Sequence, residues 1–92
     1  MNSEVHDNPA EHQFELIVDG HVALAAYRLK PGVITFTHTE VPKELGGRGI
    51  GSQLAQGALD QVRARGLKVV PLCPFIKAYI EKHPEYADLV RA

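Results

Sequence analysis

The 92-residue chain has little cysteine, no excess of positive charge and no long apolar run. Its one cysteine, Cys73, has no partner for a disulfide within the chain. The formal net charge is -1, whereas nucleic-acid-binding proteins need clustered basic residues to neutralise phosphates. The apolar stretch from Val69 to Ile76 has eight residues, two of them prolines, and a membrane-spanning helix needs about 20. We therefore expect no nucleic-acid partner and no contact with a membrane.

The start of the chain lacks the features of a secretion signal. Residues 1–7 have neither a basic start nor an apolar core. Together with the single thiol, this predicts a reduced, cytoplasmic location. Residues 1–11 are polar and contain Asn8-Pro9, so we expect a flexible N-terminal leader there. The remaining residues, 12–92, are enough for one folded domain with a single core.

Alternating apolar residues predict three antiparallel strands in the first half. The alternation begins at Phe14 and stops at Asp19-Gly20, a dipeptide that favours a hairpin turn. A second strand is expected over residues 22–29. It ends at Pro31-Gly32, where proline presets the first turn position and glycine supplies a positive φ at the second. A third strand is expected over residues 33–41. Strict alternation would place four of its side chains on one face, namely Ile34, Phe36, His38 and Glu40.

The second half predicts a helix, a short strand and a second helix. Apolar residues recur at helical spacing from Ile50 to Val62, and Gly66 can end this helix in the left-handed conformation. Residues 67–72 predict a strand parallel to the third one. Because Pro71 cannot donate a ladder hydrogen bond, we expect a gap beside it. Pro74 fits the first position of the second helix. The fold class is therefore mixed α/β (α+β), with a mainly antiparallel sheet, one parallel βαβ crossover and two helices.

A glycine-rich loop joins the third strand to the first helix. Residues 44–52 contain four glycines and Arg48. Glycines allow backbone N–H groups to face a ligand, and the helix adds unpaired N–H donors and its positive dipole end. The loop therefore predicts a phosphate or pyrophosphate site, and the alternative is that the glycines only form a tight turn.

Two well-known phosphate-binding motifs do not fit this loop. The P-loop of nucleotide triphosphatases needs Lys and then Ser or Thr after its last glycine, whereas Ser52-Gln53 follows Gly51. The dinucleotide fingerprint needs an acidic residue after the next strand, and that strand ends in Leu72-Cys73-Pro74.

The loop and its flanking sequences resemble the GNAT acetyltransferase superfamily. Gly49-Ile50-Gly51, which follows a strand and Val41-Pro42, is similar to the acetyl-coenzyme A pyrophosphate loop of that superfamily. The superfamily pattern has Gln or Arg where this chain has Gly46. The segments that resemble small GNAT-like N-acetyltransferase domain proteins are His38–Pro42, Leu67–Phe75, Tyr79-Ile80 and His83–Tyr86.

The resemblance, which covers residues 12–90, implies that acetyl-coenzyme A (acetyl-CoA) binds and that the acetyl group is transferred to an amine. The sequence does not identify the amine. The pantetheine arm would lie in the gap beside Pro71 and bind backbone groups of Thr39 and Val41. The residues implied in binding the pyrophosphate are Gly46, Gly47, Arg48, Gly49, Ile50, Gly51 and Ser52.

Cys73, His38 and Glu40 are the candidate catalytic residues. Cys73 precedes a helix, where the dipole and free N–H groups favour a thiolate. It could take the acetyl group and pass it on, or line the thioester pocket while an amine attacks directly. Alternatively, it is a small buried hydrophobe. His38 or Glu40 could accept the proton that the amine loses, although His38 could instead be a hydrogen-bonded core histidine.

Other classes of function stay open at this point. The chain could be a degenerate, non-catalytic acyl-CoA-binding or interaction module, which the glycine at position 46 favours, or a structural protein without a ligand. The five histidines are scattered, with no pair at helical i, i+4 spacing, so we expect no metal ion.

Overall fold

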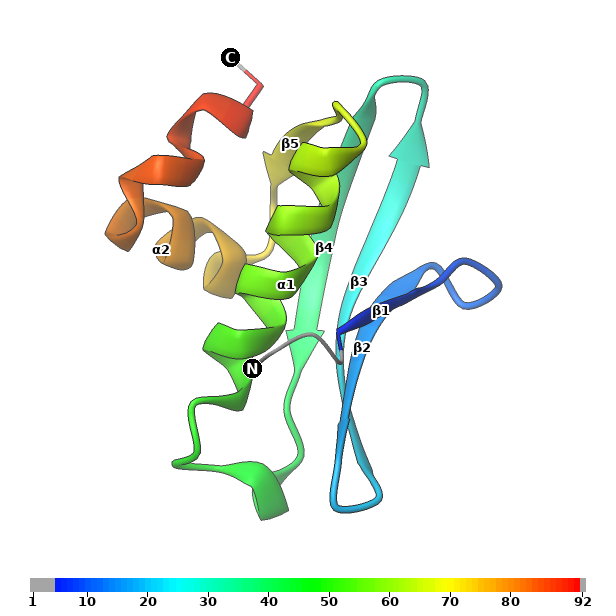
Figure 1. The fold of residues 1–92 in the computed structure, drawn as a ribbon, viewed down its shortest axis with the longest axis vertical. Helices are drawn as coiled ribbons and strands as arrows, with labels where there is room; N and C mark the ends of the chain where they lie inside the picture. The colour runs from blue at the N-terminus through cyan, green and yellow to red at the C-terminus, as the bar shows by residue number, and fades with distance from the viewer. Residues whose placement is uncertain (1–4, 92) are drawn as a thin grey trace.

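The computed structural model describes residues 5–91, which form a five-stranded sheet with its helices on one side (Figure 1). The strands lie in sequence order across the sheet. β1 to β4 are antiparallel, and β5 is parallel to β4, so the predicted fold class is confirmed. In chain order, the elements are β1 (His6–Asn8), β2 (Gln13–Val18), β3 (His21–Lys30), β4 (Val33–Glu40), the 3-10 turn η1 (Lys43–Leu45), α1 (Ile50–Ala64), β5 (Lys68–Pro71), α2 (Pro74–Lys82) and the 3-10 helix η2 (Pro84–Leu89).

The turns and the helix end follow the local sequence signals. Asp19 and Gly20 have φ values of 51° and 78°, as the predicted hairpin requires, and Gly32 has a φ of 76°. Gly66, with a φ of 69°, follows α1, and the N–H of Leu67 donates to the carbonyl oxygen of Val62 at 3.1 Å. This is the expected left-handed helix ending, and it turns the chain into β5.

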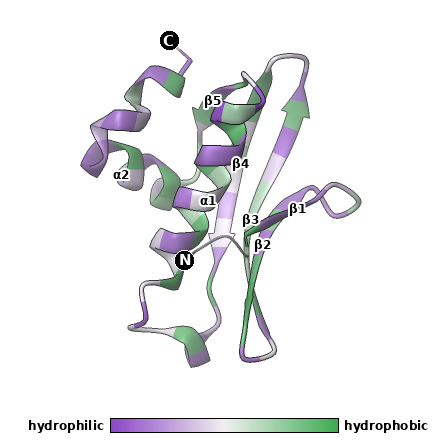
Figure 2. Cartoon of the chain, viewed as in Figure 1, coloured by the Kyte–Doolittle hydropathy of each residue, from purple (hydrophilic) through white to green (hydrophobic). Residues whose placement is uncertain are grey.

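The core lies between the sheet and α1. The ribbon of α1 alternates between hydrophobic and hydrophilic segments, as expected for a helix with one buried side (Figure 2). Phe14 of β2 and Phe36 of β4 are fully buried, with ring centroids 6.0 Å apart. The buried residues of α1 are Ile50, Leu54, Ala55, Ala58, Leu59 and Val62. This packing fixes α1 against the strands that hold the candidate site.

The strand β1 near the start of the chain contradicts one prediction from the sequence. Residues 6–8 form β1 and pair with β2, whereas the sequence predicts a flexible leader over residues 1–11. Val5 is buried against α1, and a Cβ added to Gly57 would come 2.5 Å from its side chain. A polar three-residue strand has too little periodicity to be recognised, and its contacts come from residues distant in the sequence. Residues 1–4 of the expected leader lie outside the described residues.

Asp7 connects β1 to the rest of the sheet. The Tyr27 hydroxyl donates to Asp7 at 2.6 Å, and Arg65 Nη2 donates to the same carboxylate at 2.9 Å. Burial, followed by the hydrogen bond to Asp7, raises the pKa of Tyr27 to about 12. The neutral phenol is therefore favoured in the folded state.

This tyrosine predicts a loss of stability at alkaline pH. An unfolded tyrosine loses its proton near pH 10, before the folded Tyr27 does. The contribution of Tyr27 to the free energy of unfolding is therefore complete below about pH 10 and declines towards about pH 12. Urea unfolding gives the free energy of unfolding at about pH 9 and about pH 11. Between these two pH values, this free energy is expected to decline less for Tyr27→Phe than for the native protein. Equal declines in the two proteins would contradict this role of Tyr27.

Candidate functional site

The candidate site begins where β4 and β5 separate. Their parallel pairing runs from Val33 opposite Lys68 to Phe36 opposite Pro71 and ends there. The N–H of Cys73 then donates to the carbonyl oxygen of Phe36 at 2.9 Å. Residues 37–40 continue β4 without a partner in β5. The predicted gap beside Pro71 is therefore confirmed, and it leaves strand backbone available for a ligand.

A β-bulge changes the faces of β4 just before this end. Tyr27 pairs with Phe36 and Ala26 pairs with His38, so Thr37 is the extra residue on β4. Beyond the bulge, Thr39 lies opposite Ala25, which is buried on the face covered by α1. The prediction that His38 shares a face with Phe36 is therefore wrong. Strict alternation could not reveal it, because the bulge shifts every later side chain to the other face.

His38 and Glu40 form an exposed pair on the uncovered face of the sheet. His38 Nε2 lies 3.0 Å from Glu40 Oε2, and the two side chains are 56% and 65% exposed. His38 is thus not a core histidine. The charge of the Glu40 carboxylate is solvated by water, so it carries no cost of burial. The pair is accessible to a substrate that approaches this face.

Cys73 and Thr39 meet on the opposite, helix-covered face. Cys73 is 2% exposed, and its Sγ lies 3.2 Å from Thr39 Oγ1. Cys73 occupies the position before α2, and its carbonyl oxygen accepts a hydrogen bond from the N–H of Lys77 at 3.0 Å. The structure therefore brings the thiol to the end of β4 that has no partner in β5, and places it on the other side of the sheet from the His38–Glu40 pair.

The glycine loop presents backbone N–H groups at the start of α1. Gly47 and Gly49 have φ values of 77° and 70°, a conformation that strains residues with a side chain. In the described part of the chain, no backbone acceptor is recorded for the N–H groups of residues 47–52, and no side chain caps α1. These donors and the positive end of the helix dipole form a cradle suited to an anion.

Arg48 is already engaged by a neighbouring hairpin. Its Nη1 donates to Asp19 Oδ2 at 2.9 Å, and both side chains are largely exposed. This ion pair connects the glycine loop to the turn between β2 and β3. The loop is therefore positioned from two sides, by this pair and by the start of α1.

A pocket of about 210 Å³ lies beside the contact between the first turn of α1 and α2. A Cβ on Gly51 would come 2.8 Å from the ring of Phe75, so this glycine allows the two helices to approach closely. The pocket was not predicted from the sequence, although the i, i+4 spacing of Tyr79 and His83 is a signal for one shared surface. Its lining residues are Ser52, Phe75, Ala78, Tyr79, Lys82 and His83.

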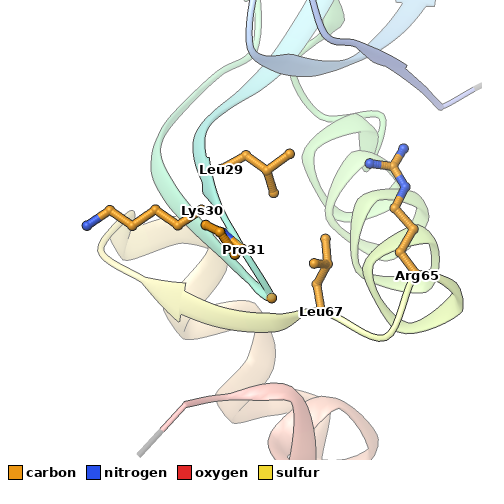
Figure 3. Close-up of a pocket in the computed structure, with 6 residues that line it drawn as sticks. Leu29, Lys30, Pro31, Arg65 and Leu67 are labelled. Atoms are coloured by element: carbon orange, nitrogen blue, oxygen red, sulfur yellow. The ribbon is translucent and has the colours of Figure 1, made fainter.

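Two other hollows lie away from the β4–β5 gap. One of about 400 Å³ lies at the turn between β3 and β4, the opposite end of β4 from the glycine loop. In Figure 3, Leu29 and Leu67 line this hollow, Arg65 reaches towards it from the end of α1, and Lys30 extends away from it. A second hollow, of about 540 Å³, lies beside Arg48 and β2.

Metal-binding clusters and membrane-spanning helices are absent from residues 5–91. Within this range, no group of three or more His, Cys, Asp or Glu side chains could hold a metal ion. None of the helices in the same range is both long enough and apolar enough to cross a membrane.

Comparison with known proteins identifies the class to which this fold belongs. A family model described as GCN5-related N-acetyl-transferase matches residues 13–89. The chain therefore belongs to the GCN5-related N-acetyltransferase family, and the resemblance seen in the sequence is confirmed.

Individual relatives support the same assignment. Protein NATD1 of Gallus gallus and Protein NATD1 of Homo sapiens are each 40% identical to this chain over 52 residues, or 56% of it. Those alignments cover 47% and 46% of the relatives, so the chain spans about half the length of the curated relatives that it matches. The NMR solution structure of a GCN5-like protein from Staphylococcus aureus superposes with a TM-score of 0.73 at 31% identity, covering 99% of this chain and 90% of that one.

Proposed function

We propose that the protein binds acetyl-CoA where β4 separates from β5 and transfers the acetyl group to an amine. The observation that carries the proposal is the junction of the end of β4, where residues 37–40 have no partner on the β5 side, with a cradle of free N–H groups at the start of α1. Membership of the GCN5-related N-acetyltransferase family supports this use of the junction.

The pyrophosphate would lie at residues 46–52. The backbone fits this group because Gly47 and Gly49 adopt left-handed conformations with no atom within 4 Å of an added Cβ, so nothing fills the space above them. Arg48 contributes its backbone N–H, since its guanidinium is paired with Asp19. The positive end of the α1 dipole adds to the attraction for phosphate.

The pantetheine arm would lie against the edge of β4 that has no partner in β5, at residues 37–40. Backbone groups of Thr39 and Val41 would bind its amides, in place of the ladder hydrogen bonds that β5 makes only as far as Phe36. Thr39 and Cys73, 3.2 Å apart, would then lie beside the thioester. Such hydrogen bonds fix a substrate so that the reacting groups meet in a productive geometry.

The amine would approach from the uncovered face of the sheet. Bound acetyl-CoA supplies an acetyl group activated as a thioester, and the attacking amine must lose a proton as its bond to the acetyl carbon forms. With His38 Nε2 bonded to Glu40, the other ring nitrogen of His38 is positioned to accept that proton. The amine would thus reach the thioester through the gap between β4 and β5, and coenzyme A would leave as the free thiol when the carbon–sulfur bond breaks.

An assay of turnover distinguishes an acetyltransferase from a non-catalytic acyl-CoA-binding module. Release of the free thiol of coenzyme A is measured with acetyl-CoA and a panel of polyamines and lysine peptides. We expect the native protein to release thiol faster than buffer, and His38→Ala to retain about a tenth of that rate. This loss is smaller than the roughly hundredfold or larger loss that is typical for a general base, because water can replace an exposed one.

Glu40→Gln is expected to act like His38→Ala, whereas the matched control Glu81→Gln, on the exposed surface of α2, keeps the native rate. Binding of acetyl-CoA without thiol release for any amine would favour the binding module. Equal rates for His38→Ala and Glu81→Gln would remove His38 from the mechanism.

The burial of Cys73 favours direct attack by the amine over an acetylated enzyme. A thiol that is 2% exposed and in contact with Thr39 is held in the wall of the site. We expect intact-protein mass spectrometry after incubation with acetyl-CoA to show no added acetyl group, and Cys73→Ala to keep more than about a tenth of the native rate. An acetyl group on Cys73, together with an inactive Cys73→Ala variant, would establish covalent transfer instead.

A further inference from the structure

The uncovered face of the sheet carries two basic residues of β3, Arg28 and Lys30. Buried residues alternate with more exposed ones along β3, so both lie on the face opposite to the buried Tyr27. In Figure 3, the side chain of Lys30 extends away from the hollow that Leu29 lines. Within residues 5–91, no hydrogen bond or ion pair is recorded for the side chain of Arg28 or Lys30. These two charges are therefore available to a partner.

The strand register places Arg28 and Lys30 on the same face as the His38–Glu40 pair. Ala26 lies opposite His38, and Arg28 follows two residues further along β3. At about 3.4 Å per residue, Arg28 is about 7 Å from Ala26 along the strand, and Lys30 is about 14 Å from it. One short extended peptide can therefore reach both the proposed base and the two cations.

The other end of this face is acidic. Leu24 of β3 lies opposite both Glu15 of β2 and Glu40 of β4, so the two carboxylates are on this face. Hydrogen bonds from Gln13 and Asn8 lower the pKa of Glu15, which therefore stays charged near neutral pH. The face thus has a negative end, where the amine would react, and a positive end along β3.

We propose that the uncovered face binds an extended acidic segment of a protein, and that Arg28 and Lys30 select acceptor lysines with acidic residues nearby. The ammonium group of such a lysine is attracted to Glu40. Carboxylates two and four residues from the lysine would lie over Arg28 and Lys30, because the peptide and β3 have the same rise per residue. An open sheet face suits an extended chain better than a small molecule, since small-molecule sites are concave. The inference rests on the proposed function and names the class of its acceptor.

Binding of labelled lysine peptides tests this inference without turnover. Fluorescence anisotropy compares a peptide that has glutamate two and four residues after the lysine with one that has glutamine there. A second pair of peptides has these residues before the lysine, because the direction of the bound chain is not fixed by the charges. The native protein is expected to bind the glutamate peptide of one pair about fivefold more tightly, the size of two exposed ion pairs, and less selectively at high salt.

Two double variants assign this preference to the uncovered face. Arg28→Gln with Lys30→Gln is expected to bind the glutamate and glutamine peptides equally. Lys77→Gln with Lys82→Gln removes the same charge from exposed positions of α2, on the helix-covered side, and is expected to keep the native preference. A preference that persists without Arg28 and Lys30, or is missing from the native protein, would overturn the inference.

Thiol release from acetyl-CoA, measured with subsaturating amounts of the same peptides, separates this inference from the proposed function. Faster release with the glutamate peptide would support both. Equal release with the two peptides would overturn the inference and leave the proposed function in place. Selective binding of the glutamate peptide without any release would support the acidic-segment site and contradict the proposed transfer.

Discussion

Gly49→Asp is expected to weaken the binding of acetyl-CoA by at least about a hundredfold. A carboxylate at this position would lie in the cradle proposed for the pyrophosphate, and two like charges about 4 Å apart repel by about 4 kcal/mol at an effective dielectric constant of 20. The substitution also places a side chain at a φ of 70°. Isothermal titration calorimetry of the two proteins measures the loss, with circular dichroism as the check on folding.

Two control variants separate charge from backbone strain. Gly49→Ala imposes similar strain without the charge, so it is expected to bind far better than Gly49→Asp. Gly32→Asp introduces the same side chain at a φ of 76°, at the opposite end of β4, and is expected to bind like the native protein. Native-like binding by Gly49→Asp would contradict the location of the pyrophosphate.

Phe14→Ala is expected to lower the free energy of unfolding by about 3–5 kcal/mol. Phe14 is fully buried, its ring lies 5.4 Å from that of Tyr27 and 6.0 Å from that of Phe36, and the guanidinium of Arg65 lies 5.7 Å above it. The total free energy of unfolding of a small domain is only about 5–15 kcal/mol, so the variant is expected to be partly unfolded at moderate temperature. Urea denaturation of the native and variant proteins gives the difference.

Phe75→Ala provides the matched control for this loss. Its side chain is 41% exposed and lies at a pocket rather than in the core, so its removal is expected to cost about 1 kcal/mol. A loss for Phe14→Ala no larger than that for Phe75→Ala would contradict the central place of Phe14 in the core.

Local sequence signals predicted most of the architecture correctly. Asp19-Gly20 and Gly66 each need a positive φ, which few residues adopt, so they mark a turn and a helix end without reference to the rest of the fold. Pro71 has no N–H, and the pairing of β5 with β4 ends at this residue. The glycine loop was recognisable because its glycines follow a strand and open a helix.

The features that were missed depend on contacts between distant segments. The bulge at Thr37 arises from the register between β3 and β4, and no residue type in β4 identifies it. It decides which side of the sheet His38 and Thr39 face, so His38 and Glu40 were correctly predicted to be neighbours but were placed on the wrong face of the sheet. The pocket between α1 and α2 likewise depends on the close approach of Gly51 and Phe75.

The most direct measurement is an NMR titration of the ¹⁵N-labelled protein with coenzyme A, because backbone N–H groups are the proposed ligands. The largest amide shifts are expected at residues 46–52, with further shifts at residues 39–41 and around Cys73. Saturable shifts in these three segments would support the cofactor site at the junction of β4, α1 and α2. An unchanged spectrum, or shifts confined to the hollow around Leu29, would contradict it.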